Sequence, residues 1–274
     1  MADDLKNTIG VFDSGVGGLS VLRALRQQLP AQPVIYFGDQ AHVPYGPRPL
    51  EVVRAYSTEV TRFLLDRGAK LIVVACNTAS AAALHPLRSE FPVIPFVGME
   101  PAVKPAAEQT HSGVVGVLAT YATFQGALYA SVVERFAHGV TLLQSPCPGL
   151  VAQIEKGNLN GVETRQILSE ILDPMLAQGI DTVVLGCTHY PFVIPLIEEI
   201  VGPDVRVIDP APAIARQTRR LLVDHGLLAD ESGKGTVEFY TSGEPNEMQS
   251  LLPLFLGEDG IVKKATWVNG KLTE

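Results

Sequence analysis

The sequence predicts an α/β protein with two similar domains, each a mostly parallel sheet flanked by helices, related by a pseudo-twofold axis with the functional site between them. Three observations carry this prediction. Short apolar runs alternate with helical patterns, and the alternation starts again in the middle of the chain. Two cysteines, Cys76 in LIVVACNTAS and Cys187 in DTVVLGCTHYP, also follow apolar runs in matching positions.

The first half of the chain alternates strand, helix, strand, helix, strand. Its predicted strands are the apolar runs at residues 9–12, 34–39 and 71–77, and its predicted helices cover 20–29 and 52–68. Runs that are apolar throughout are typical of parallel strands with helices on both faces. We therefore expect a doubly covered parallel sheet here.

The second half repeats this order. Its predicted strands lie within residues 113–120, 140–146, 181–191 and 205–209, and its predicted helices cover 123–136 and 164–179. Thr120 precedes Cys187 by about as many residues as Asp13 precedes Cys76. The two halves are therefore predicted to be related units.

Two proline-containing stretches are predicted to connect these units. Residues 93–109, VIPFVGMEPAVKPAAEQ, form the expected crossing, and residues 208–217, IDPAPAIARQ, form the expected return. Both are candidates for a hinge. Periodicity does not assign the strand-like run 237–243 or the tail 265–270 to either unit.

The composition is that of an ordinary globular chain of 274 residues. Lys and Arg total 21 against 29 Asp and Glu, and the net charge of −8 disfavours direct binding to nucleic acid or to anionic membranes. The N-terminus lacks a secretory signal, and no apolar run approaches the roughly 18 residues of a membrane span. We therefore expect a cytoplasmic protein whose three cysteines are free thiols.

A glycine-rich turn follows the first predicted strand, in GVFDSGVGGLS. Such turns bring backbone N–H groups close to an anion, but the spacing fits neither GxGxxG nor a Walker phosphate loop. A tight turn explains the glycines and leaves Asp13 and Ser14 unexplained. These two residues are therefore candidates for a role at the site.

The two strand-end cysteines have several interpretations. A single buried cysteine is more often a small apolar core residue, as we expect for Cys147 in SPCPGL. A zinc site of Cys76, Cys187 and His189 lacks the usual ligand spacing, and a redox dithiol favours cysteines within one turn. As a pair followed by polar side chains, the two thiols are better explained as reactive groups facing one substrate.

Five motifs together resemble the glutamate racemases of bacterial cell-wall synthesis, within the aspartate/glutamate racemase superfamily. They are GVFDSGVGGLSVLR at 10–23, VPYG at 43–46, ACNTAS at 75–80, SPCPGLVAQIE at 145–155 and LGCTHYP at 185–191. Position 20 is Ser in this chain, whereas Thr is common there in this family, and we expect no functional role for this residue. The resemblance also implies the domain limits 1–98 plus 210–274 and 99–209.

The resemblance implies cofactor-independent interconversion of L- and D-glutamate, which supplies D-glutamate for peptidoglycan. Racemisation removes the α-proton from one face and returns a proton to the other, which needs two acid/base groups. Cys76 and Cys187 would fill these roles. By resemblance Asp13 would support Cys76, and His189 with Glu155 would support Cys187.

The remaining site residues also follow from the resemblance and from the substrate, which is small, dicarboxylic and zwitterionic. Hydroxyl, amide and backbone donors would bind it without a paired arginine. The substrate-binding candidates are Asp13, Ser14, Tyr45, Gly46, Asn77, Thr78, Thr120, Thr188 and His189. No lysine lies within these motifs, so we expect neither pyridoxal phosphate nor any other cofactor, and no metal.

The resemblance further implies a homodimer, and DNA gyrase is a candidate protein partner because some glutamate racemases act on it. Two rival hypotheses stay open at this stage. One is a racemase of aspartate or another small acid in the same superfamily. The other is an amino-acid sensor that keeps the pocket without catalysis, although such a protein would not need two thiols.

Overall fold

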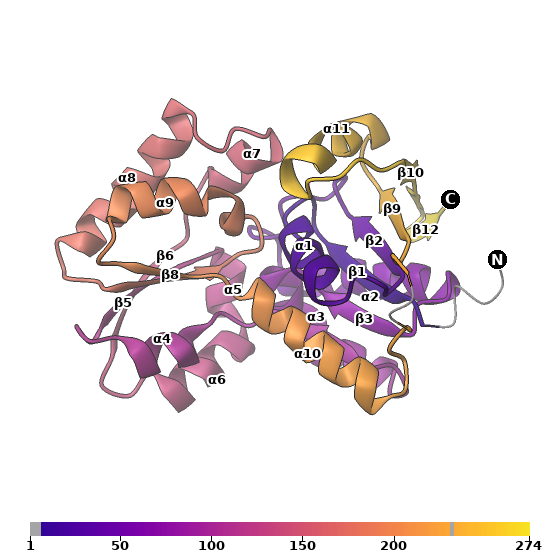
Figure 1. Cartoon of the computed structure of the whole chain (residues 1–274), viewed down its shortest axis with the longest axis horizontal. Helices are drawn as coiled ribbons and strands as arrows, with labels where there is room; N and C mark the ends of the chain where they lie inside the picture. The colour runs from indigo at the N-terminus through magenta and orange to yellow at the C-terminus, as the bar shows by residue number, and fades with distance from the viewer. Residues whose placement is uncertain (1–6, 231–232) are drawn as a thin grey trace.

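The computed structural model describes residues 7–230 and 233–274 and divides into two halves, each built around its own parallel sheet (Figure 1). The first sheet runs in the order β10-β9-β2-β1-β3-β4. Its strands are β1 (Ile9–Asp13), β2 (Val34–Gly38), β3 (Leu71–Val74), β4 (Phe96–Gly98), β9 (Val237–Thr241) and β10 (Val262–Lys264). All of its neighbouring strands pair in parallel.

The second sheet runs in the order β6-β5-β7-β8, also in parallel. Its strands are β5 (Val114–Ala119), β6 (Thr141–Ser145), β7 (Thr182–Gly186) and β8 (Arg206–Ile208). This order repeats the arrangement of β2, β1, β3 and β4 in the first sheet. The predicted α/β class with two similar domains is confirmed.

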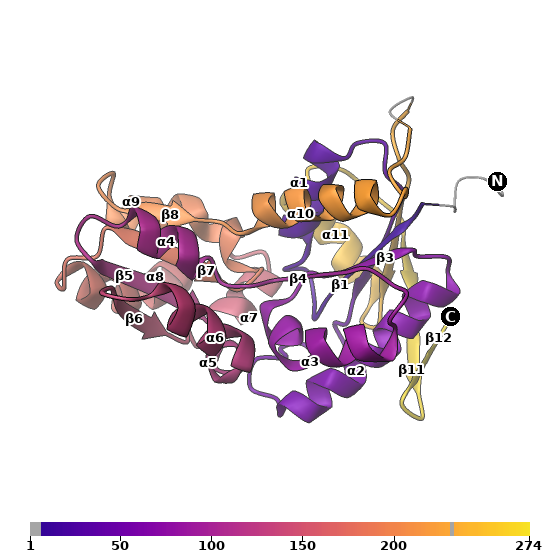
Figure 2. The same cartoon turned by 90° about the horizontal axis from the view of Figure 1, so that it is seen from below.

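Helices cover both faces of the first sheet (Figure 2). One face carries α1 (Leu19–Gln28), α10 (Ala211–Asp224) and α11 (Pro245–Phe255), and the other carries α2 (Leu50–Asp66) and α3 (Asn77–Glu90). The strands supply fully buried side chains to both layers: Val11 and Val73 face the α1 side, whereas Phe12 and Val74 face the α3 side. This double burial explains why these strands are apolar throughout.

The second sheet is covered in the same way (Figure 1). The helices α8 (Val162–Leu176) and α9 (Ile194–Val201) lie on one face, and α4 (Val103–Gln109) and α6 (Ala127–Phe136) lie on the other. Three short elements lie beside these layers: α5 (Tyr121–Gln125), α7 (Leu150–Glu155) and the 3-10 turn η1 (Tyr190–Val193). The helix expected at 123–136 is split because Gly126 is extended, with φ −71° and ψ 137°.

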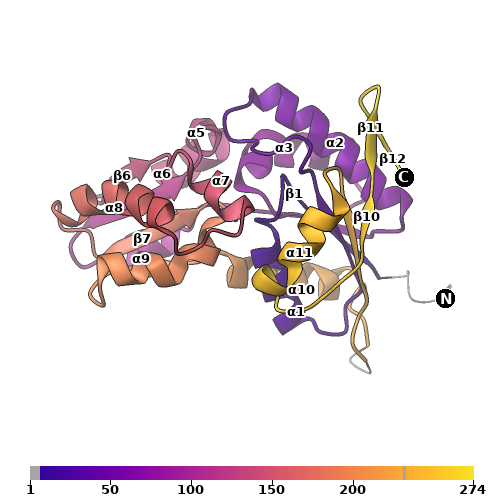
Figure 3. The same ribbon diagram turned by 90° about the horizontal axis from the view of Figure 1, so that it is seen from above.

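The chain passes between the halves after β4 and returns between β8 and α10 (Figure 2). After the return, α10 packs against α1, and β9 and β10 extend the first sheet beyond β2. A hairpin of β11 (Thr266–Val268) and β12 (Lys271–Thr273) then lies beside α2 (Figure 3). Within the described residues, no helix is both long and apolar enough to cross a membrane.

Candidate active site

The two strand-end thiols line one cavity between the carboxyl ends of the two sheets. Cys76 follows β3 and Cys187 follows β7, so each thiol comes from the third strand of its half. Open sheets with this strand order bind ligands where the order reverses, between the first and third strands. The cavity is lined by Ser14, Pro44, Tyr45, Gly46, Cys76, Asn77, Thr78, Thr120, Val151, Cys187, Thr188 and His189.

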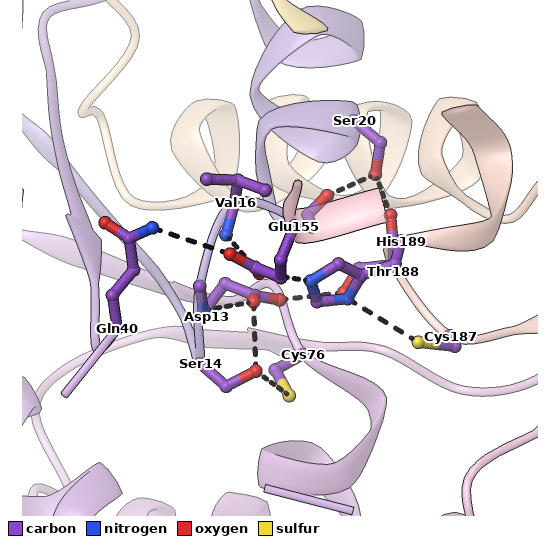
Figure 4. Close-up of polar contacts among 12 residues, drawn as sticks. Asp13, Ser14, Val16, Ser20, Gln40, Cys76, Glu155, Cys187, Thr188 and His189 are labelled. Carbon is purple, nitrogen blue, oxygen red and sulfur yellow. Dashed lines mark hydrogen bonds and ion pairs between the residues drawn. The ribbon is translucent and has the colours of Figure 1, made fainter. Parts of the chain in front are cut away.

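Asp13 ends β1 and is fully buried beneath this cavity (Figure 4). Its Oδ1 accepts hydrogen bonds from Gly15 N at 2.8 Å and Ser14 Oγ at 3.2 Å. Its Oδ2 accepts one from Thr188 Oγ1 of the other half at 2.7 Å. Burial raises the pKa of the Asp13 carboxyl, although His189 and the Thr188 hydrogen bond oppose the rise.

Cys76 caps the N-terminus of α3, where its Sγ accepts from Ala79 N at 3.4 Å. Ser14 Oγ lies 4.0 Å from the same sulfur and connects it with Asp13. A helix N-terminus favours a thiolate, but burial and the charge of Asp13 raise the pKa of Cys76 well above its usual range. Cys76 is therefore a neutral thiol in this conformation.

Cys187 lies at the end of a buried chain of three titratable groups (Figure 4). Its Sγ is 3.7 Å from His189 Nδ1, and His189 Nε2 is 2.6 Å from Glu155 Oε1. Burial lowers the pKa of His189, but its contacts with Cys187 and Glu155 outweigh burial and raise that pKa well above 6.5. Both ring nitrogens of the resulting imidazolium are donors, and Nδ1 is the one that faces the Cys187 sulfur.

Glu155 completes this chain as a carboxylate. Burial raises its pKa, but the hydrogen bond and charge of His189 outweigh that effect and hold the pKa below 4.5. Val16 N of the opposite half also donates to Glu155 Oε1 at 2.9 Å. Contacts of Glu155 and Thr188 with the β1–α1 turn therefore join the two halves at the site itself.

The glycine-rich turn after β1 leaves room for this His189–Glu155 pair. A Cβ atom on Gly17 would lie 2.4 Å from His189 Nδ1, and one on Gly15 would lie 2.1 Å from Glu155 Oε1. Neither glycine has the positive φ that would by itself favour glycine. Close approach of the pair, and not turn geometry, therefore explains these two residues.

Gly17→Ala is expected to lower kcat/KM about tenfold by displacing the His189 ring, because small misplacements of catalytic groups are costly. Gly233→Ala is the matched control, since a Cβ there meets nothing within 4 Å and its φ is not in the positive range. Steady-state kinetics and melting temperatures of both variants test this. Wild-type kinetics for Gly17→Ala would show that His189 does not need its present position.

The His189–Glu155 pair should also make stability depend on pH. A raised His189 pKa stabilises the fold fully below 6.5, and this contribution is lost as the pH rises through the raised value. The lowered Glu155 pKa stabilises the fold above 4.5, and that contribution is lost as the pH falls through the lowered value.

Comparison of wild type with His189→Gln by chemical denaturation tests this dependence. The difference in free energy of unfolding should be largest between pH 4.5 and 6.5 and should narrow at higher pH. A difference that stays constant from pH 5 to about pH 9 would mean that the pKa of His189 is not raised in the folded protein.

The predicted substrate-binding residues that line the cavity differ in whether their side chains already make hydrogen bonds within the protein. Asn77 is 2 % exposed, and neither its Oδ1 nor its Nδ2 has a hydrogen-bond partner within the described residues. Thr78 Oγ1 and Thr120 Oγ1 lie 2.8 Å apart across the two halves, and Thr120 also caps α5. The Tyr45 hydroxyl instead donates to Asp39 at 2.6 Å, so only its backbone is free to serve the cavity.

The cavity encloses about 20 Å³, little more than one water molecule needs. An amino acid cannot enter without movement of the loops or of the two halves. The structure therefore corresponds to a closed site.

Sequence reasoning missed three contributors to this site. Ser20, which we expected to have no role, lies 2.8 Å from the carbonyl oxygen of Thr188 and donates to it. Gln40 Nε2 lies 3.5 Å from Glu155 Oε2, and Asp39 binds Tyr45. Asp39 and Gln40 directly follow β2, so their position at the end of a predicted strand is the signal that could have found them.

Across residues 7–230 and 233–274, no group of three His, Cys, Asp or Glu side chains is placed to hold a metal ion. Cys147 is buried and does not line the cavity, although it shares Tyr190 as a hydrogen-bond partner with Cys187; its Sγ donates to the carbonyl oxygen of Ser145 at 3.6 Å.

The family model for the Asp/Glu/Hydantoin racemases matches residues 9–218 of this chain. The chain belongs to this racemase family. It is therefore an isomerase of the amino-acid racemase type, and the resemblance predicted from the five motifs is confirmed. The racemase is 50% identical over 260 residues to a glutamate racemase of Stutzerimonas stutzeri, covering 95% of this chain and 98% of that relative.

Solved structures of glutamate racemases share the fold of this racemase. The enzyme of Francisella tularensis in complex with D-glutamate matches with a TM-score of 0.82 and 31% identity, over 95% of this chain and 97% of that one. The enzyme of Escherichia coli in complex with L-glutamate and the activator UDP-MurNAc-ala matches with a TM-score of 0.83 and 31% identity. That match covers 96% of this chain and 100% of the other.

Proposed function

We propose that this racemase interconverts L- and D-glutamate without a cofactor, with Cys76 and Cys187 as the two acid/base groups. The observation that carries the proposal is the placement of both thiols on one small, buried cavity, each with its own polar support. Racemisation needs one group that takes the α-proton and a second that returns a proton to the other face. We take glutamate as the substrate because the relatives described above are glutamate racemases.

The two thiols have different electrostatic surroundings. His189, held as an imidazolium by Glu155, lies 3.7 Å from the Cys187 sulfur and would stabilise negative charge that develops there, whereas burial keeps Cys76 as a thiol. Cys187 would remove the α-proton of one enantiomer while Cys76 protonates the opposite face. After this step Cys187 carries the proton and Cys76 the charge.

The other enantiomer requires the reverse assignment, in which Cys76 removes the proton. Asp13 is suited to help because burial raises its pKa, which makes its carboxylate a better proton acceptor. The Ser14 hydroxyl lies between the two groups, 3.2 Å from Asp13 Oδ1 and 4.0 Å from Cys76 Sγ. We propose that Asp13 accepts the Cys76 proton through the Ser14 hydroxyl, while the His189 imidazolium gives its Nδ1 proton to Cys187.

Glutamate would be held by neutral donors. Asn77 is the leading ligand because its buried amide has no partner among the described residues, and leaving such a group unpaired costs stability. The hydroxyls of Ser14, Thr78, Thr120 and Thr188 and the backbone of Tyr45 and Gly46 would supply the remaining contacts. Charge-assisted hydrogen bonds to carboxylates are strong enough to replace a paired arginine.

Closure of the two domains would exclude water from the site. The fixed dipoles of these donors would then stabilise the developing carbanion more strongly. We propose domain limits at 1–98 plus 210–274 and 99–209, with hinges at the two connections. The two sheets support these limits, since β9 and β10 belong to the first sheet and β5 to β8 form the second. We also propose that the enzyme works in the cytoplasm, where its three free thiols would stay reduced.

The product D-glutamate would serve peptidoglycan synthesis, as the family resemblance implies. A homodimer and an interaction with DNA gyrase are further proposals from the same resemblance. Size-exclusion chromatography with light scattering tests the dimer, and a supercoiling assay with added racemase tests the gyrase interaction.

Circular dichroism of purified, reduced protein with L-glutamate, after EDTA treatment and without pyridoxal phosphate, tests the proposed reaction. The signal should decay to zero, and D-glutamate should give the mirror-image decay. Faster decay of the signal with L-aspartate than with L-glutamate would favour aspartate as the substrate. Unchanged signal with both acids would favour the sensor hypothesis, and activity lost with EDTA would point to a metal.

A further inference from the structure

A second buried carboxylate, Asp39, lies beside the active site and takes no part in the mechanism above. It follows β2, next to Asp13, and is fully buried. Its Oδ2 accepts hydrogen bonds from Tyr45 at 2.6 Å and from His42 Nδ1 at 3.0 Å. Both donors belong to the loop of residues 39–48, which we call the substrate loop.

The other oxygen of Asp39 is held by the C-terminal part of the chain. Ser242 Oγ donates to Oδ1 at 2.6 Å, and Trp267 Nε1 donates to it at 2.8 Å. Ser242 follows β9, and Trp267 lies in β11, the first strand of the hairpin whose second strand, β12, packs beside α2 (Figure 3). Both residues lie beyond residue 218, where the match to the racemase family model ends.

The substrate loop forms one wall of the active-site cavity. Pro44, Tyr45 and Gly46 line it, and Gly46 approaches Thr120 of the second domain so closely that a Cβ would lie 3.0 Å from its Cβ. Trp267 also packs on this loop, edge to face with the His42 ring at 5.1 Å between centroids. The C-terminal hairpin therefore touches the loop both through Asp39 and directly.

We propose that Ser242 and Trp267 are positioning residues for glutamate binding, acting through Asp39 to hold the substrate loop in its closed position. The inference rests on the proposed function and adds the C-terminal segment to the site. Asp39 is suited to this task because the segment binds its Oδ1, while Tyr45 of the loop binds its Oδ2 and His42 Nδ1 lies within 3.1 Å of both oxygens. A buried carboxylate with four donors fixes geometry well, since each bond to it is charge-assisted.

The role of the Tyr45 side chain follows from the same contacts. Its hydroxyl is committed to Asp39, so the loop contributes to substrate binding through the backbone at Tyr45 and Gly46. Backbone groups can bind a carboxylate only if the loop is held in place. Loss of an anchor should therefore weaken substrate binding more than it slows chemistry.

Trp267→Phe tests the proposal most selectively, because it keeps the aromatic packing and removes the N–H donor. Loss of one hydrogen bond to a charged group should raise the KM for glutamate about tenfold, with kcat within about twofold. Ser242→Ala should have a similar effect. Because both groups donate to the same oxygen, the double variant should raise KM by less than the product of the two single effects.

Tyr129→Phe is the matched control, since its buried hydroxyl has no partner among the described residues and does not line the cavity. It should leave KM unchanged. A KM unchanged in both Trp267→Phe and Ser242→Ala, or a lower melting temperature in them with wild-type KM, would overturn the proposal. Turnover of glutamate by the wild-type enzyme in the same assay tests the proposed function. The positioning role is tested separately, by the ratio of the KM of each variant to the KM of the wild type.

Discussion

Cys76→Ser and Cys187→Ser are each expected to slow racemisation of both glutamate enantiomers by at least about 1,000-fold, because a hydroxyl replaces one of the two acid/base groups. The loss of racemisation rate should be similar in the two single variants, since each turnover needs one acid/base group on each face of the substrate. The double variant should be little slower than either single variant, because the thiols act as a unit.

Cys147→Ser is the matched control for these variants. Cys147 is a third buried thiol that does not line the cavity, so its replacement should leave kcat/KM within a few-fold of wild type. Circular dichroism assays with both enantiomers measure all four proteins, and melting temperatures show that they fold. A folded Cys76→Ser or Cys187→Ser enzyme with near wild-type activity would remove that thiol from the mechanism.

His189→Gln is expected to lower kcat/KM by about 100-fold or more, because the imidazolium that stabilises charge on Cys187 is lost. The loss must be equal in both directions, since the equilibrium constant between enantiomers is one. The isotope effect with α-deuterated glutamate should nevertheless grow for one enantiomer only, the one whose α-proton goes to Cys187.

A folded control separates this effect from general damage to the enzyme. His138 is an exposed histidine outside the site, so His138→Gln should behave as wild type. An isotope effect that grows equally for both enantiomers in His189→Gln would show that His189 serves both thiols. An activity loss that Glu155→Gln does not share would separate His189 from its carboxylate partner.

Much of the fold could be predicted from the sequence, because apolar periodicity records burial directly. The strands β2, β3, β5 and β7 lie within the apolar runs, β1 extends one residue beyond its run, and the matching positions of Cys76 and Cys187 indicated the repeated topology. The strand β4 and the helix α4 lie inside the stretch expected as a crossing. They are short and contain or adjoin prolines, so their periodicity is weak.

Other features depend on contacts between distant parts of the chain. The pKa of Cys76 is set by burial and by Asp13, and no local pattern reports either effect. The glycines at 15 and 17 make room for side chains more than 130 residues away, at Glu155 and His189. The role proposed for Trp267 likewise needs the hairpin to reach Asp39, which periodicity could not place.

The central claim is that two different groups exchange protons with the two faces of one glutamate, and racemisation in heavy water tests it most directly. Mass spectrometry of each enantiomer early in the reaction measures deuterium at the α-carbon. Two thiols predict product that carries solvent deuterium while the remaining substrate stays unlabelled, from either starting enantiomer. Product that retains the substrate proton, or equal labelling of substrate and product from the start, would contradict the account and indicate a single base.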